Sequence, residues 1–304
     1  MSDRKLVRII VGILILGYVI FGTSFMTNIK ETRASIANVK SEDKKKKAEV
    51  NGNLKISYLD VGQADSILIE NNNEYMLIDA GNNEDGEKLV NYFEENDIKE
   101  FKYVIATHAH EDHIGGMDDI INSFKIDTYY MPYVMSTTKT FEDVLNALEE
   151  KKLKFSTPKI DDTFKLGDAD VTILYVGEEG SDLNDTSIVL KITFGNNSFL
   201  FTGDATSSVE KKILDKDIKS DVLKVAHHGS SYSSKPEFLD KVNPTYAIIS
   251  CGKNNIYNHP EKVTINNLND RNIKIYRTDL DGTIILTSDG KNINITTSNT
   301  DTNG

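Results

Sequence analysis

Cysteine is nearly absent from this chain. Its 304 residues include one cysteine, Cys251, so no disulfide can form within the chain. Cysteine usage therefore leaves open whether the protein works in an oxidising or a reducing compartment. Hydrophobic residues are also somewhat scarce, at 38%, because both ends of the chain are polar. The remaining length still allows a sizeable core, in one large domain plus an anchor or in two small domains.

Basic residues are outnumbered by acidic ones. The chain carries 35 Lys and Arg against 47 Asp and Glu, a formal net charge of −12. Residues 51–304 alone hold 25 basic and 42 acidic side chains, a formal charge near −17. Because nucleic-acid affinity normally comes from Lys and Arg that neutralise phosphates, we expect such a domain to bind DNA weakly unless metal ions or a local basic patch compensate.

A long apolar run lies near the N-terminus. Residues 9–25 are about long enough to cross a bilayer as one helix. Basic residues precede the run, as in a signal peptide or signal anchor, and no small-residue cleavage site follows closely. The sequence therefore predicts an uncleaved transmembrane helix within residues 1–26, which makes the membrane a partner, with the following domain outside the cell membrane. A cleaved signal, which would make the protein secreted, is the alternative.

The rest of the chain divides by composition. Residues 27–50 are polar and rich in lysine, which is typical of a flexible linker. Residues 51–290 have the texture of a folded domain, and residues 291–304 form a tail of mostly Asn, Thr and Asp that we expect to be disordered. No short-period repeat is present. Nothing in the sequence identifies a protein partner.

Apolar patterning predicts strands and helices in two similar, strand-rich halves. Alternating or continuous apolar runs predict strands at residues 54–61, 65–70, 74–81, 101–110, 127–133, 170–177, 186–194, 197–204, 221–230, 246–252, 273–279 and 283–290. Helical spacing predicts helices at residues 86–98, 117–124, 140–153, 207–216 and 259–271. The pattern favours an α+β fold in which two sheets pack face to face with helices outside, a four-layer αββα sandwich.

Histidine is also scarce, and its placement is uneven. Three of the six histidines fall within THAHEDHIGG, residues 107–116. His108 and His110 alternate on an extended segment, so both side chains point to the same side. Asp112 and His113 follow where the chain begins to turn. Two imidazoles beside a carboxylate–imidazole pair make two adjacent half-sites for divalent metals; surface histidines without a metal role are the alternative.

The other histidines and two aspartates also lie at the ends of predicted strands. KVAHHGS places His227 and His228 after one strand, and His259 lies in a loop after another. Asp204 closes the run FTGD, and Asp79 closes LIDAG. Each aspartate alone would more often be a turn residue. Several strand ends that deliver His and Asp together indicate one edge of a sandwich that carries a dinuclear metal site.

These motifs carry a family resemblance. THAHEDH matches the HxHxDH signature of the metallo-β-lactamase superfamily, and the segments around Asp79, Asp204 and HHGS fall in the order of its other motifs. YLDVGQADSILIE, TGD, LKVAHHGS, NHP and YRTDLDGTI further resemble the metallo-β-lactamase-like domain of ComEC-type DNA-internalisation proteins. The resemblance covers residues 54–289. The many membrane helices of a full ComEC channel are not found in this sequence.

The resemblance implies metal ligands in this chain. His108 and His110 would bind a first divalent ion, and Asp112 and His113 would bind a second. Asp204 would bridge the two. The implied cofactors are therefore two divalent metal ions, Zn²⁺ or Mn²⁺.

The resemblance also implies residues that act around the metals. His227 would complete the second site with His228 beside it facing substrate, although the two roles could be reversed. His228 and His259 would join Asp112 in catalysis, with His259 contacting substrate or a leaving-group oxygen. Asp79 would orient the ligand loop from behind.

The family pattern is incomplete at one position. The superfamily often supplies another histidine to the first metal, and no histidine lies between His113 and His227. The corresponding stretch is DLNDTSIVL, in which an oxygen could come from the side chains of Asn184, Asp185 or Ser187. Such a site would be harder and would accept Mn²⁺ as well as Zn²⁺.

The loop between the first two predicted strands completes the expected site. It carries Gln63 and Asp65, which the resemblance places at the rim. These residues contact no metal in this interpretation.

The implied activity is hydrolysis by a water that two metals activate. A phosphodiester in single-stranded DNA or in a cell-envelope polymer is the favoured substrate, which makes the chain a phosphodiesterase or nuclease of ComEC-like type. An envelope phosphorylcholine esterase or a lactonase on the same metals is the alternative. A non-catalytic, metal-stabilised binding module is a third hypothesis, and intact metal ligands argue against it.

Overall fold

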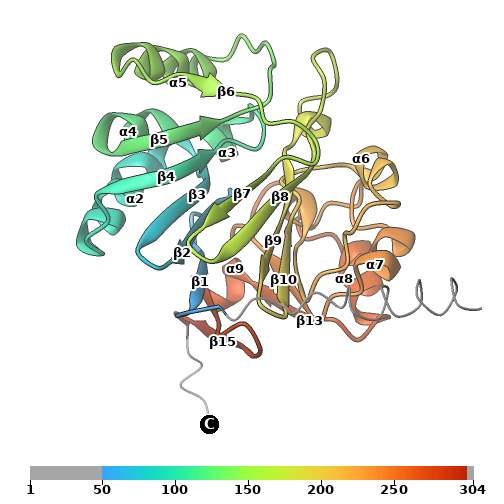
Figure 1. Cartoon of the computed structure of the whole chain (residues 1–304). Helices are drawn as coiled ribbons and strands as arrows, with labels where there is room; N and C mark the ends of the chain where they lie inside the picture. The colour runs from blue at the N-terminus through green and yellow to red at the C-terminus, as the bar shows by residue number, and fades with distance from the viewer. Residues whose placement is uncertain (1–49, 300–304) are drawn as a thin grey trace, which may run out of the picture. The chain divides into compact units, whose positions relative to one another are not determined.

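Two β-sheets pack against each other in the computed structural model, which describes residues 50–299 (Figure 1). In the first sheet, the strands follow the order β15 (Ile293–Thr297), β14 (Ile284–Ser288), β1 (Leu54–Tyr58), β2 (Ser66–Asn71), β3 (Glu74–Ala80), β4 (Glu100–Ile105), β5 (Lys125–Tyr130) and β6 (Phe155–Ser156). Strands β3 to β6 run parallel, and the other neighbours are antiparallel.

The second sheet has a similar organisation. Its strands follow the order β13 (Lys274–Arg277), β12 (Tyr246–Ile249), β11 (Val222–Lys224), β10 (Asn197–Phe201), β9 (Val189–Phe194), β8 (Ala169–Tyr175) and β7 (Thr163–Leu166). Strands β10 to β13 run parallel, whereas β7 to β10 are joined antiparallel. Each sheet therefore contains a parallel block, in which all strands end at the same edge.

Side-chain alternation explains why these strands are buried on both faces. In β3, Met76 and Ile78 lie in the apolar cluster between the two sheets, whereas Leu77 lies in a cluster on the opposite face. Successive side chains of a strand point to opposite faces. A strand covered on both sides therefore reads as a continuous apolar run, as MLI does here.

Helices cover the outer face of each sheet. The first sheet is covered by α2 (Gly86–Glu95), α4 (Met117–Ser123) and α5 (Lys139–Glu150), which contribute to one apolar cluster. The second is covered by α6 (Ser207–Lys212), α7 (Pro236–Val242) and α8 (Lys262–Asn269) through another. With the cluster between the sheets, these form the layers helix, sheet, sheet and helix. The predicted two-sheet sandwich is therefore confirmed.

One predicted domain boundary differs from the structure, and the N-terminal segments cannot be compared with it. The tail expected after residue 290 contains β15, which pairs with β14 over its whole length; Ile293 and Ile295 pack against the central cluster and hold it there. The predicted transmembrane helix in residues 1–26 and the linker up to residue 49 lie outside the described residues. Among residues 50–299, no helix has both the length and the apolar character needed to cross a membrane.

Candidate metal centre

The predicted site residues follow the ends of parallel strands in both sheets. Asp79 lies near the end of β3, and THAHEDH follows β4 and enters the short helix α3 (Glu111–Ile114). Asp204 follows β10, and the histidine pair follows β11 in the 3₁₀ turn η3 (Ala226–Gly229). Carboxyl ends of parallel strands are the usual ligand-binding edge of an α/β sheet. The two blocks thus bring distant segments to one place.

Asp79 fixes His113 from behind. Asp79 Oδ2 accepts a hydrogen bond from His113 Nδ1 at 2.8 Å and another from Thr107 Oγ1 at 2.7 Å. Its Oδ1 accepts from the Thr107 backbone N–H at 2.8 Å. With Nδ1 donating to a carboxylate, His113 Nε2 keeps its lone pair for a metal. The orienting position expected for Asp79 is where the structure places it.

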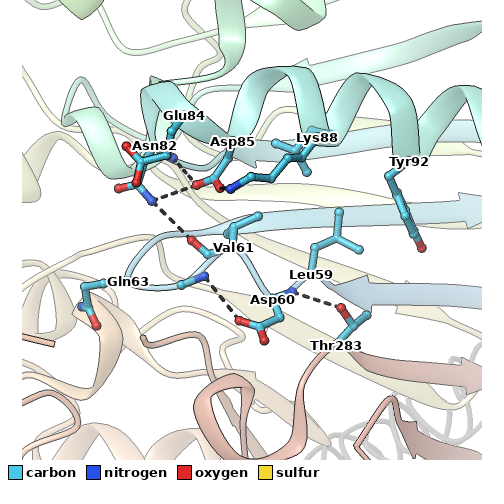
Figure 2. Close-up of a pocket in the computed structure, with 12 residues that line it drawn as sticks. Leu59, Asp60, Val61, Gln63, Asn82, Glu84, Asp85, Lys88, Tyr92 and Thr283 are labelled. Atoms are coloured by element: carbon cyan, nitrogen blue, oxygen red, sulfur yellow. Dashed lines mark hydrogen bonds and ion pairs between the residues drawn. The ribbon is translucent and has the colours of Figure 1, made fainter. Parts of the chain in front are cut away.

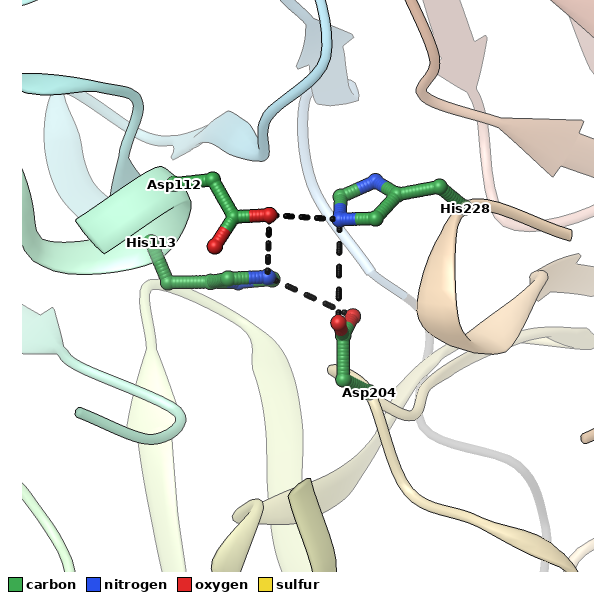
Figure 3. A group of neighbouring side chains, drawn as sticks. All are labelled: Asp112, His113, Asp204 and His228. Atoms are coloured by element: carbon green, nitrogen blue, oxygen red, sulfur yellow. Dashed lines mark hydrogen bonds and ion pairs between the residues drawn. The ribbon is translucent and has the colours of Figure 1, made fainter. Parts of the chain in front are cut away.

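Four side chains from three segments surround one point (Figure 3). His113 Nε2 lies 3.3 Å from Asp204 Oδ1 and 3.9 Å from Asp112 Oδ2. His228 Nε2 lies 3.2 Å from Asp112 Oδ2 and 3.6 Å from Asp204 Oδ2. All four ligand atoms lie within 4.8 Å of one another. Two imidazole nitrogens and two carboxylates at such spacing are a donor set for Zn²⁺ or Mn²⁺.

His108 and His110 form a second group beside the first. His108 Nε2 lies 3.0 Å from His110 Nδ1 and 4.0 Å from Asp204 Oδ2. The strand β4 ends at Ile105, so the two residues lie on an extended loop, but their rings converge as the alternation predicts. Asp204 therefore faces both groups, which is the geometry expected of a bridging carboxylate.

Unpaired buried atoms show that the donor set fits a cation. Among residues 50–299, His113 Nε2 and Asp204 Oδ1 are buried without any hydrogen-bond partner. Buried polar atoms are rarely left unpaired, since each unmade bond costs about 1–3 kcal/mol. A metal at this point would satisfy both atoms.

The charges of the His and Asp side chains at this centre also favour the binding of positive charge, as protons or as a metal ion. Burial alone would lower the pKa of His113, but Asp204, Asp79 and Asp112 raise it well above the ordinary value. Burial would raise the pKa of Asp204, yet His113 and His228 hold it well below the ordinary value. Burial lowers the pKa of His108, which keeps that imidazole neutral. Metal binding would replace protons at this cluster.

The backbone of η3 decides which histidine of the pair joins the group. His227 and His228 both adopt left-handed conformations, with φ of 53° each, so their rings diverge at 6.3 Å between centroids and an interplanar angle of 70°. His228 Nδ1 donates to the Ser250 carbonyl at 3.0 Å, which turns Nε2 toward Asp112. His227 Nε2 remains 3.8 Å from Asp204 Oδ2. Of the two arrangements that the sequence left open, the geometry favours the one in which His228 joins Asp112, His113 and Asp204.

A glycine positions Asp204. Gly203 adopts φ of 50°, and a Cβ there would lie 3.0 Å from Thr107 Cβ and 3.1 Å from Ser187 Oγ. Ser187 Oγ accepts from the Asp204 backbone N–H at 3.1 Å. The close approach that Gly203 allows thus seats Asp204 next to the histidine loop.

The oxygen ligands expected from DLNDTSIVL are only partly supported. Ser187 supports Asp204 from behind, and Asp185 accepts a hydrogen bond from Thr206. Asn184 Oδ1 is buried without a partner among residues 50–299. The side chains of Asp185 and Ser187 are thus engaged with Thr206 and with the Asp204 backbone, and the structure gives neither of them a contact typical of a metal ligand.

Asp65 is not at the rim, where the sequence interpretation puts it. Its side chain is 1% exposed and pairs with Lys224 Nζ at 2.6 Å. Its carboxylate lies 3.9 Å from His113 Nδ1 and 3.8 Å from His228 Nδ1, on the side away from the ligand atoms. The backbone N–H of Asp65 donates to the Asp112 carbonyl at 3.1 Å, which draws the residue inward.

Lys224 is a residue that the sequence reasoning missed. It is the last residue of β11, and its side chain is 1% exposed. An isolated lysine in the apolar run DVLKVA, just before the histidine pair, is the signal that would have found it.

The open side of the centre is a hollow of about 380 Å³. Gln63 lines it, as expected of a rim residue, and so do His227 and His259. The His259 ring lies 5.4 Å from that of His227 and 5.8 Å from that of Tyr257. His259 therefore faces the space in front of the ligand atoms without joining them.

A family model for the metallo-β-lactamase superfamily matches residues 59–253, which include the THAHEDH loop, Asp204 and the histidine pair. The chain belongs to the metallo-β-lactamase superfamily. It is also homologous to two competence proteins, with 31% identity over 250 residues to ComE operon protein 3 of Bacillus subtilis strain 168 and 26% identity over 234 residues to competence protein ComA of Neisseria gonorrhoeae. Each alignment covers 75% of this chain but only 32% and 31% of the relative.

Solved structures agree on the fold. The metallo-β-lactamase fold protein YhfI of Bacillus subtilis superposes with a TM-score of 0.54 at 13% identity, over 78% of this chain and 100% of that one. CmlA, a diiron β-hydroxylase of Streptomyces venezuelae, gives a TM-score of 0.51 at 16% identity, over 79% of this chain and 54% of that one. At such identities the likeness concerns the fold alone. In this metallo-β-lactamase domain, the His and Asp cluster is a candidate metal site, and the two features together suggest a hydrolase.

Proposed function

We propose that this metallo-β-lactamase domain is a metal-dependent phosphodiesterase of the ComEC-like type. One observation carries the proposal: Asp204 faces two imidazole groups at once, with its buried Oδ1 unpaired among residues 50–299. His108, His110 and Asp204 would hold one ion, and Asp112, His113, His228 and Asp204 would hold the other.

Two divalent ions held there would supply Lewis-acid activation of water and of the phosphoryl oxygens. The protein side chains do the rest. Asp79 and the Ser250 carbonyl fix the tautomers of His113 and His228, so both Nε2 atoms stay aimed at one point. Gln63 and His259 line the open side, where they would contact the bound phosphodiester and a leaving-group oxygen.

The homology with competence proteins supports a phosphodiester, in single-stranded DNA or in a cell-envelope polymer. The strong acidic excess of residues 51–304 argues against tight binding of a long polyanion. We therefore propose that the substrate is held mainly through a single phosphodiester at the metal centre, and less through a basic surface.

The test is turnover of bis-p-nitrophenyl phosphate and single-stranded DNA by protein loaded with Mn²⁺ or Zn²⁺. A lactone and an unloaded sample serve as comparisons. We expect hydrolysis of a diester in the loaded protein alone, and loss of both metal and turnover in Asp204→Ala. A fully loaded wild type that opens the lactone but cleaves neither diester would refute the proposal.

We also propose that residues 9–25 anchor the domain at the outer side of the membrane. Their apolar run and preceding basic residues support this. Fractionation of cells and protease treatment of intact cells give the check. Recovery of the full chain with the cytosol would contradict it.

A further inference from the structure

A second hollow of about 540 Å³, here called the side pocket, lies next to the metal centre. Figure 2 shows its two walls: the turn η1 (Asn83–Asp85) with the start of α2 on one side, and the loop after β1 on the other, with Thr283 nearby. Gln63 and Asn82 line both the side pocket and the hollow of the metal centre. A ligand at the metals can therefore extend across these two residues into the side pocket.

Gln63 is built into this junction as a hydrogen-bond donor. Its Oε1 accepts from the Gly252 backbone N–H at 3.0 Å, which fixes the direction of the amide. Its Nε2 is buried and has no hydrogen-bond partner in the described part of the chain. A Cβ at residue 252 would lie 2.6 Å from the backbone nitrogen of Gln63, so only glycine admits this close approach of the two segments. A donor fixed and unpaired at the boundary of two hollows is suited to an ester oxygen of a ligand.

The base of the side pocket is apolar. Leu59 and Leu89 are 4% and 3% exposed, and Val61 and Tyr92 pack against the same apolar cluster. Ligand pockets typically combine such an apolar lining with a few polar groups that fix orientation. The side pocket therefore suits an organic group with carbon surface.

The charged side chains at the rim of the side pocket determine which organic group it suits. Asp60 and Glu84 lie on opposite walls, and neither forms an ion pair among residues 50–299. The positive charge in the lining belongs to Lys88, which is paired with Asp85 at 3.1 Å. Two unpaired carboxylates repel a further phosphate and attract an ammonium group, and the face of a tyrosine such as Tyr92 adds to that attraction.

We propose that the side pocket binds an amine-bearing organic substituent of the phosphodiester whose phosphate lies at the metal centre. This inference rests on the phosphodiesterase function proposed above and specifies its substrate class. Gln63 Nε2 donates to an oxygen of the ester as the substituent passes into the pocket. Asp60 and Glu84 balance the charge of the amine. The preferred substrate then carries a positive group next to its phosphate, not a second phosphate.

Binding is tested without turnover. Choline and its uncharged isostere 3,3-dimethylbutan-1-ol are titrated into the full-length protein by calorimetry or NMR. We expect choline to bind about tenfold more tightly than the alcohol, since the two carboxylates attract the ammonium group and have no such interaction with the uncharged isostere. The preference should vanish in Asp60→Asn/Glu84→Gln. The control, Glu87→Gln/Glu94→Gln, removes the same charge from exposed positions of α2 that do not line the pocket, and should keep it.

Turnover gives the second readout. Turnover is compared on two substrates, p-nitrophenylphosphorylcholine and bis-p-nitrophenyl phosphate. On the choline ester, we expect the pocket variant, Asp60→Asn/Glu84→Gln, to raise KM by about tenfold with little change in kcat. On bis-p-nitrophenyl phosphate, which carries no amine, the same variant should not raise KM. Equal binding of choline and the alcohol, or a pocket variant that behaves as the control variant does, would overturn the inference. If choline binds as expected but neither diester is cleaved, the phosphodiesterase function fails and the cation site stands.

Discussion

Lys224 and Asp65 form a fully buried ion pair that joins the two sheets directly behind the metal centre. Their atoms Nζ and Oδ2 are 2.6 Å apart, and each side chain is 1% exposed. Lys224 ends β11 of the second sheet, and Asp65 immediately precedes β2 of the first. A buried ion pair adds little stability over an apolar pair, but removal of one partner leaves an uncompensated charge.

Replacement of Lys224 by Met should therefore destabilise the domain severely. We expect a loss of about 3–5 kcal/mol in the free energy of unfolding, measured by urea denaturation with chelator present.

Lys191→Met is the matched control for this prediction. Lys191 is also buried, but its partner Asp217 at 3.0 Å is 86% exposed, so water stabilises the freed carboxylate. That control should lose about 1 kcal/mol or less. Asp65→Asn added to Lys224→Met should recover part of the loss, and equal losses in the two lysine variants would contradict this account.

Replacement of Asp79 by Asn should weaken metal binding while it preserves the backbone. Asp79 has φ of 59°, a conformation that Asn tolerates well. The amide cannot accept hydrogen bonds from both Thr107 and His113 as the carboxylate does, so His113 loses the partner that fixes its tautomer. We expect metal affinity to fall about 10–100-fold, measured by competition with a chromophoric chelator. Thr107→Val, which leaves the carboxylate in place, should have a smaller effect; unchanged affinity in Asp79→Asn would rule out the orienting role.

The two adjacent histidines should differ in metal content when each is replaced by Ala. His228 Nε2 lies within 3.6 Å of both Asp112 and Asp204, whereas His227 lies 3.8 Å from Asp204 alone. We expect His228→Ala to lose one metal ion per chain and His227→Ala to retain the wild-type content. Elemental analysis after gel filtration decides the matter. A loss confined to His227→Ala would restore the original sequence assignment.

Glu210 should make stability depend on pH. This side chain is 2% exposed, and burial raises its pKa to about 7, although backbone N–H groups of Ser234 and Lys235 oppose the shift. The folded state then holds a proton more tightly than the unfolded chain, so stability is highest below the ordinary pKa of glutamate and falls as pH rises through about 7. The expected loss between pH 5 and pH 8 is on the order of 3 kcal/mol. Urea unfolding at both pH values should show a smaller loss in Glu210→Gln, and the same pH slope in both proteins would disprove the shift.

Much of the fold and part of the site could be predicted because the signals are local. Apolar runs marked the buried strands, and helical spacing marked α2, α4 and α5. His108, His110, Asp112 and His113 lie within six residues, so their convergence follows from the geometry of one loop. Asp79 and Asp204 were identified because several predicted strand ends carry His or Asp, although each aspartate alone would more often be a turn residue.

Other features depend on contacts between distant segments. The strand β15 was missed because its sequence is polar, and it is held by pairing with β14 and by two isoleucines. The choice of His228 over His227 depends on left-handed backbone at both residues and on the Ser250 carbonyl. Asp65 was placed at the rim because nothing in its own loop indicates that Lys224, from the other sheet, buries it.

The sequence by itself determined the kinds of ligand atom, the strand ends that carry them and the family to which the domain belongs. These are properties of short segments, in which residue type and spacing fix side-chain direction. Only the tertiary structure decided which imidazole faces Asp112, which carboxylate is neutralised by a lysine and where the side pocket opens. The first two outcomes arise where the two sheets meet, because the partners of each buried charge come from chain segments that are far apart in sequence. The side pocket likewise opens between loops that are distant in sequence, after β1 and β3 of the first sheet.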